Sequence, residues 1–298
     1  MAKKENYLKR SAGENIFDTI NVIFLFLLCV VTIYPLLYVA FASISNSNLL
    51  LQHQGILLKP LGPNINAYKA VFKNPNIVSG FRNSLFVVFI GVPINVLMTA
   101  LGAYFMSRQN VMFKRPISFL FVFTMWFSGG MIPFYLVVHK LNLLNTLWGL
   151  ILPFMISSYN LIVMRTNFEN IPVELEESAK LDGAGHFTIL FKIVVPLSKA
   201  VIAVMVLFYG VNKWNSWFWG SILINDRSKH VLQVVLRGIL ISNDTTLMTT
   251  GMSSGDTESI AESIKYATTM VATIPILLVY PFIQTYFVKG VLVGAVKG

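Results

Sequence analysis

Six apolar runs, each longer than about 20 residues, divide the chain and restrict what it can fold into. An α-helix rises about 1.5 Å per residue, so about 20 apolar residues cross the hydrocarbon core of a bilayer. Hydrophobic residues make up 55% of the chain and charged residues only 12%, which is too little charge to cover a surface facing water. We expect an all-α integral membrane protein with six transmembrane helices over residues 17–42, 84–106, 116–138, 143–164, 198–224 and 264–288.

The positive charges predict which side of the membrane each segment faces. A net charge of +10 would suggest a nucleic-acid partner in a soluble protein, but here Lys and Arg lie mostly between the apolar runs. The first ten residues and the short link 107–115 are both basic, and short cytoplasmic segments retain such charges. We therefore expect no nucleic-acid partner, and a protein of the bacterial cytoplasmic membrane with both termini and residues 165–199 in the cytoplasm. The outward segments would be 43–83, 139–142 and 225–263.

No part of the chain indicates a separate domain, a metal site or an active site. The first apolar run is far longer than the 7–15-residue core of a signal peptide, so we expect it to remain as a helix. Without a Pro/Ser-rich linker or a clear repeat, we expect one transmembrane domain over residues 1–298. Cys29 is the single cysteine, and neither metal-ligand spacing nor a Ser/His/Asp pattern occurs. We expect no catalytic residue, no metal ligand and no cofactor in this chain.

One dense polar segment, residues 167–197, lies between the fourth and fifth apolar runs. Pro172 suits the first position of a helix, and the glutamates that follow it suit the first turns, where the helix dipole favours negative charge. Gly183 suits the left-handed residue that ends such a helix. The pattern predicts a short helix, a tight glycine turn and a second helix over about residues 186–194, lying along the cytoplasmic face. By spacing alone, a plain solvated connector explains the segment equally well.

Within this segment, EESAKLDGAGHFTILFKIVVP resembles the EAA loop in the membrane-spanning subunits of ATP-binding-cassette (ABC) importers. That pattern is Glu-Ala-Ala, three residues, Gly, nine residues, then Ile-x-Leu-Pro. The matching residues are Glu177, Ala179, Gly183, Ile193 and Pro196. The chain departs from the pattern at Ser178 and Val195, which are small or conservative changes. Other stretches that resemble the oligosaccharide-importer branch are RNSLFVVFIGVPINVLMTALGAYFMSR, FSGGMIPFYLVVHKLNLLNTLWGLILP, NKWNSWFWGSILI, VLQVVLRGIL and YPFIQTYFVKGVLVGAVKG.

The resemblance implies a type I ABC importer permease fold and a set of partners. A second homologous permease, in a heterodimer, would complete the pore, and an extracytoplasmic solute-binding protein would deliver an oligosaccharide. Two ATPase subunits would bind ATP and Mg, because this chain has no Gly-x-x-x-x-Gly-Lys-[Ser/Thr] motif to hold nucleotide phosphates.

The EAA loop would be the coupling helix that docks in a cleft of the ATPase. Leu181 and Phe187 suit apolar anchors on an otherwise polar loop, and Gly183 permits a close approach. Glu177 and Asp182 suit pairing with basic groups of the ATPase. The predicted ATPase-coupling residues are Glu177, Ser178, Ala179, Leu181, Asp182, Gly183 and Phe187.

The stretch YGVNKWNSWFWG in the fifth apolar run combines aromatic rings with amides. Rings stack on the apolar face of a sugar while amides bond its hydroxyl groups. For Trp217 and Trp219, an aromatic belt at the outer membrane interface explains the rings equally well. The residues predicted to line a substrate path are Tyr209, Asn212, Lys213, Trp214 and Asn215.

Lys213 is a charge inside a predicted transmembrane helix, where an ammonium is costly unless it is wet or paired. Three interpretations stay open. The side chain reaches outward to the interface, it pairs with an acid of the partner subunit, or it meets a carboxylate on an acidic sugar. The third suggests a uronate substrate such as an alginate fragment.

Two other classes of function fit the sequence less well. An ion-coupled carrier needs an acid within the membrane and a duplicated half, whereas the predicted helices contain only Asp18, at the very start, and no visible repeat. A membrane-embedded enzyme needs a catalytic cluster, which the sequence does not contain.

Overall fold

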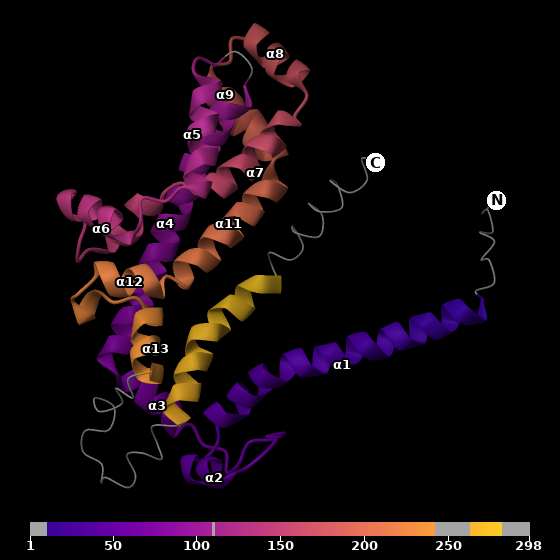
Figure 1. Cartoon of the computed structure of the whole chain (residues 1–298), viewed down its shortest axis with the longest axis vertical. Helices are drawn as coiled ribbons and strands as arrows, with labels where there is room; N and C mark the ends of the chain where they lie inside the picture. The colour runs from indigo at the N-terminus through magenta and orange to yellow at the C-terminus, as the bar shows by residue number, and fades with distance from the viewer. Residues whose placement is uncertain (1–10, 109–110, 242–262, 282–298) are drawn as a thin grey trace. The chain divides into compact units, whose positions relative to one another are not determined.

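The computed structural model describes residues 11–108, 111–241 and 263–281, and these residues form helices and loops without a strand (Figure 1). The chain divides into two compact units. One comprises Met1–Ala70 and Gly251–Met270, and the other comprises Val71–Thr250 and Val271–Gly298. That the whole chain acts as one transmembrane domain stays a prediction.

The first unit is built on α1 (Ala12–Ser43), a 32-residue helix. Ser11 and Glu14 form a capping box in which each side chain accepts a hydrogen bond from the backbone N–H of the other. The apolar side chains along α1 are largely exposed in this chain, as expected for a surface that meets lipid or another subunit. After α1 come α2 (Ser47–Gln52) and a small core of Ala42, Leu50 and Leu57.

The helix α3 (Asn66–Lys73) leads into the second unit, where α4 (Pro75–Ser107) is the central element. Against α4 pack α7 (Ser158–Glu169), α11 (Lys199–Trp214) and α13 (Leu232–Ile241), and Figure 1 shows α7 and α11 beside it. Asn74 caps α4 and Pro75 occupies its first turn, so the helix begins well before the predicted residue 84. A Cβ on Gly80 would lie 3.2 Å from Leu232 Cα, so this glycine allows α13 to approach closely.

The remaining elements of the second unit are short. They are α5 (Lys114–Trp126), α6 (Met131–Lys140), the 3-10 segments η1 (Leu147–Leu150) and η2 (Leu152–Phe154), α8 (Val173–Leu181), α9 (His186–Ile189), the π-helical η3 (Leu190–Val194), α10 (Val195–Leu197), α12 (Trp217–Leu223) and the 3-10 segment η4 (Arg227–Lys229). A last helix, Ser263–Pro281, contributes residues to both units.

The structure replaces three of the predicted continuous helices by broken ones. Residues 116–138 form α5 and α6, because Gly130 between them has a φ of +87° that a helix does not accept. Residues 143–164 begin in η1 and η2, and α7 follows after a bend of 47°. Residues 198–224 are interrupted between α11 and α12. Hydropathy is continuous through these runs, but Gly, Pro, Ser and Asn within them favour turns.

By length and hydropathy, three described helices are able to cross a membrane, namely Ala12–Ser43, Pro75–Ser107 and Ser263–Pro281. Counting each of two bent pairs as one span raises the number in the described residues to five. The six crossings and their orientation stay predictions. The basic N-terminal residues, residues 282–288 of the predicted last helix and the C-terminal tail lie outside the described residues.

Candidate functional site

The polar segment between α7 and α11 forms the predicted pair of helices joined by a glycine turn. Gly183 has a φ of +82°, and its N–H donates to the carbonyl of Lys180 at 3.0 Å. The N–H of Ala184 donates to the carbonyl of Ala179 at 2.9 Å. These two bonds form a Schellman motif, which requires a left-handed residue after the helix ends. The prediction that Gly183 ends the first helix in a left-handed conformation is therefore confirmed, as is a second helix starting at His186.

The residues predicted to contact an ATPase lie mostly on the exposed side of this turn. Leu181 is 90% exposed and Phe187 is 71% exposed, although both are large apolar side chains. The other predicted residues are exposed at Glu177, Ser178, Asp182 and Gly183, and half-buried at Ala179. Apolar side chains exposed among polar ones are typical of an interaction surface. Contact of these residues with an ATPase stays a prediction.

Underneath this surface, a buried ion pair fixes α8 to the end of α4. Arg108 donates to the carboxylate of Glu176, and also to the carbonyl of Phe168 in α7 at 3.3 Å. The Nζ of Lys180 lies 3.0 Å from the same carboxylate. Burial raises the pKa of Glu176, but the hydrogen bond from Lys180 and the charge of Arg108 outweigh it, so the pKa is lower than usual. Glu176 is therefore an ionised anchor for the helix.

A second contact ties α9 to α4, because the Tyr104 hydroxyl lies 3.1 Å from His186 Nδ1. Neither Arg108 nor Glu176 was evident as a site residue from the sequence pattern. In the sequence, Arg108 is one of several basic residues that indicate the cytoplasmic side of the membrane. Glu176 is one of three glutamates near the start of a predicted helix. The spacing of Glu176 and Lys180, four residues apart on a helix, was the available signal.

Three of the five residues predicted to line a substrate path are buried within this chain. The exposed fractions are 4% for Tyr209, 2% for Lys213 and 6% for Trp214. Trp214 donates from Nε1 to the carbonyl of Ala272 at 3.0 Å. Contact of these residues with a substrate stays a prediction, but each side chain is engaged inside its own chain.

The Lys213 ammonium lies inside the chain, and its contact with a partner acid or a sugar carboxylate stays a prediction. Its Nζ donates to the carbonyl of Leu150 at 2.6 Å and lies 5.4 Å from the centre of the Phe154 ring. A similar bond comes from α4, where Asn95 Nδ2 donates to the carbonyl of Phe154 at 2.9 Å. Both carbonyls belong to the 3-10 segments before α7, which leave backbone groups without helical partners.

Tyr209 binds the backbone on the α7 side of the break between η2 and α7. Its hydroxyl accepts from the backbone N–H of Ser157 at 3.0 Å and lies 2.7 Å from the hydroxyl oxygen of Thr99. Polar side chains of α4 and α11 thus satisfy the backbone of the broken helix. Such contacts join residues far apart in sequence, so no local pattern indicates them.

Asn212 and Asn215, by contrast, are exposed, and two residues of α13 lie at the same end of α11. Gln233 Nε2 is 3.5 Å from Asn215 Oδ1, and the guanidinium carbon of Arg237 lies 4.2 Å from the centre of the Trp217 ring. We call these five residues the α11–α13 surface. Arg237 was overlooked in the sequence although it is a lone cation in an apolar stretch, the same signal that drew attention to Lys213.

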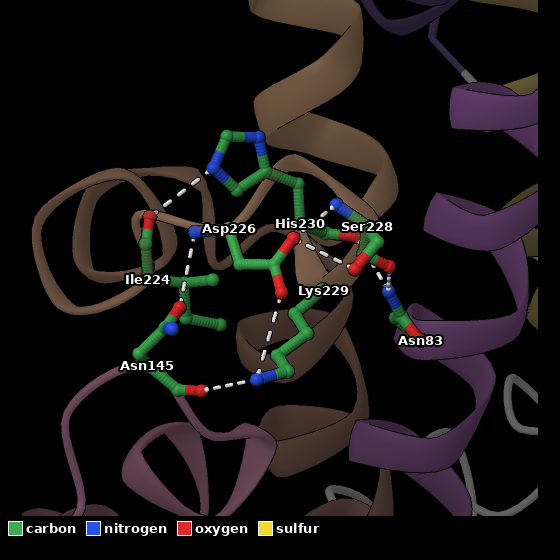
Figure 2. A network of polar contacts seen from close by, with 7 residues as sticks. All are labelled: Asn83, Asn145, Ile224, Asp226, Ser228, Lys229 and His230. Carbon is green, nitrogen blue, oxygen red and sulfur yellow. Dashed lines mark hydrogen bonds and ion pairs between the residues drawn. The ribbon is translucent and has the colours of Figure 1, made fainter.

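A separate polar network holds the loop between α12 and α13 (Figure 2). Asn83 in α4 donates from Nδ2 to the carbonyls of Ser228 at 2.9 Å and His230 at 3.0 Å. The N–H of Asp226 donates to Asn145 Oδ1 at 3.0 Å. Hydrogen bonds from the Ser228 hydroxyl and backbone N–H lower the pKa of Asp226. These polar groups bond one another within the chain, so the network fixes the loop.

The described residues contain no group of three or more His, Cys, Asp or Glu side chains placed to bind a metal ion. Residues 7–293 match the family described as "Binding-protein-dependent transport system inner membrane component". The chain belongs to this family. It is a membrane permease with an all-α fold, as predicted.

Relatives of known name are similar to this permease over nearly their whole length. It is 41% identical to Protein LplC of Bacillus subtilis (strain 168) over 302 residues, which covers 100% of both chains. It is 42% identical to the polygalacturonan/rhamnogalacturonan transport system permease protein YtcP of the same organism over 286 residues, covering 96% of this chain and 99% of the relative.

A solved structure has the same fold. It is the crystal structure of a bacterial ABC transporter involved in the import of the acidic polysaccharide alginate. One of its chains matches this permease with a TM-score of 0.86 and 29% identity, covering 94% of this chain and 99% of that chain. The resemblance to ABC importer permeases seen in the sequence is therefore confirmed.

Proposed function

We propose that this permease forms, with a second homologous permease, the path through which an ATP-driven importer takes up an acidic oligosaccharide delivered by a solute-binding protein. The α8–α9 turn faces the cytoplasm, on the same side as both termini, and docks on one of two ATPase subunits. These subunits bind and hydrolyse ATP with Mg, and this chain contributes no cofactor of its own.

The observation that carries the proposal is the construction of the α8–α9 turn. Leu181 and Phe187 are presented to solvent, while Glu176 beneath them is buried and paired with Arg108. A docking surface needs a few apolar anchors on a rigid base. Here the base is the end of α4, so a displacement of α8 by the ATPase is carried directly into the central helix of the second unit.

The nature of the substrate is supported by the names of similar proteins. One similar permease is named for polygalacturonan and rhamnogalacturonan transport. The similar solved structure belongs to an importer of the acidic polysaccharide alginate. Both favour a carbohydrate as the substrate, and the second favours an acidic one.

Replacing an anchor of the turn tests the proposal. We expect Leu181→Ser to reduce the amount of ATPase subunit that co-purifies, and substrate-stimulated ATP hydrolysis, by at least about tenfold, because a central apolar anchor contributes about 2 kcal/mol or more to an interface. The matched control is Leu58→Ser, since Leu58 is 74% exposed on a segment predicted to face outward. Normal ATPase binding and stimulation in Leu181→Ser would show that the turn is not the docking site.

A further inference from the structure

We propose that Arg237, lying over the ring of Trp217, is the residue that recognises the sugar carboxylate in the substrate path. This inference rests on the proposed function. It names the α11–α13 surface, made of Asn212, Asn215, Trp217, Gln233 and Arg237, as the place where an acidic sugar unit binds.

Arg237 is exposed and is able to bind an anion. Its guanidinium carbon lies 4.2 Å from the centre of the Trp217 ring. No described acidic side chain lies within ion-pair distance of it, whereas Lys229 is 3.6 Å from Asp226 and Arg108 is paired with Glu176. A guanidinium held by a ring face keeps its in-plane N–H groups available for other partners.

The side chains of this surface match the groups of a uronate. A guanidinium binds a carboxylate through two parallel hydrogen bonds, which a neutral hydroxymethyl group cannot form. The Trp217 side chain, part of a residue that is 39% exposed, offers a ring on which a sugar can stack. The amides of Asn212, Asn215 and Gln233 supply donors and acceptors for hydroxyl groups. Gln233 and Arg237 lie four residues apart, so they share one face of α13.

Lys213, the cation that the sequence suggested for this role, is less accessible than Arg237. Lys213 is 2% exposed, and its ammonium is bound to the Leu150 carbonyl. A carboxylate would have to displace that bond and enter a packed interior. Arg237, by contrast, is exposed beside Trp217, so its charge is available to an acidic sugar.

Uptake by the complete transporter tests the inference. The complex, with both permeases, the ATPases and the binding protein, is placed in phosphatidylcholine vesicles and given a galacturonate trisaccharide or its methyl ester of equal length. We expect Arg237→Gln to lower the ratio of acid to ester uptake about 10- to 100-fold, the usual range for losing a charged hydrogen-bonding partner. Arg237→Lys should retain part of the preference, because Lys supplies the charge without the planar pair of donors.

The control variant is Arg227→Gln, which removes another exposed arginine nearby in sequence and should leave the ratio unchanged. Three results in Arg237→Gln would overturn the inference: an equal loss of uptake of acid and ester, an unchanged ratio, or failure of the subunits to assemble. Each would mean that Arg237 makes another contact or none. Absence of uptake of either sugar by the wild-type complex would instead contradict the proposed function.

Discussion

Lys213 illustrates, at the scale of single residues, how a charge within a membrane helix can serve the backbone. Its ammonium and the Asn95 amide bind two carbonyls that the 3-10 segments before α7 leave without helical partners. Tyr209 binds the N–H of Ser157 on the other side of the break. A polar residue in an apolar run therefore has two competing uses, recognition of a ligand and support of irregular backbone. Because Lys213 is buried, we assign it to the support of irregular backbone.

The supporting role predicts the effect of Lys213→Met. The apolar replacement leaves the Leu150 carbonyl buried without a donor, which costs about 1–3 kcal/mol, and relief from burying the charge offsets part of this. We expect a lower unfolding temperature for the purified complex, and equal losses in the uptake of acidic and neutral sugars. Asn212→Ala, which alters an exposed neighbour, is the control for unfolding. An unfolding temperature equal to that of the wild type would contradict the supporting role.

At the scale of elements, the sequence correctly predicted the helices and turns whose signals lie within a few residues of one another. The α8–α9 pair was predicted because the proline, the glutamates and Gly183 all lie within a few residues of the turn they form. The breaks before α7 and after α11 were not predicted, because hydropathy stays high through them. The groups that stabilise the first break come from α4 and α11, far away in sequence. The burial of Lys213 and the exposure of Arg237 follow from the same long-range packing.

Two glycines on either side of one alanine allow a matched test of the turn. Gly183 has a φ of +82° and Gly185 has a φ of −75°, and a Cβ on either would meet no atom within 4 Å. Gly183→Ala therefore costs only backbone strain, about 1–2 kcal/mol. Gly185→Ala costs less, because its φ suits Ala, although Ala is a poorer N-cap than Gly. We expect amide hydrogen exchange in α8 and α9 to become about 5- to 30-fold faster in the first variant alone. Equal exchange in both variants would show that the left-handed residue does not hold the turn.

At the scale of the whole molecule, exposed apolar surface indicates that the chain works within an assembly. In the first unit, none of the most apolar window of α1 is buried within the chain. In the second unit, Trp126 is 81% exposed and Phe127 is 65% exposed. We expect lipid to cover part of this surface and other subunits to cover the rest. The proposed pore between two permeases would bury some of these faces.

The mass of the complex in detergent tests this view of the assembly. We expect transport-competent particles to contain this chain, one different but homologous permease and two ATPase subunits. Particles with only one type of membrane subunit would indicate a homodimer, and a functional monomer would contradict the two-permease pore. Reconstitution of the same particles into vesicles, with uptake measured, relates each mass to activity.

The length of α4 has a mechanical consequence. Asn83 attaches one part of this helix to the loop before α13, and Arg108 attaches its end to α8. Roughly 40 Å of helix separates the two attachments, at about 1.5 Å per residue. A rod of that length is a lever: a tilt of about 5° at one attachment displaces the other by roughly 3 Å, about the length of a hydrogen bond. If α8 is pushed as proposed, a small displacement there is therefore enough to make or break polar contacts at the opposite end of α4.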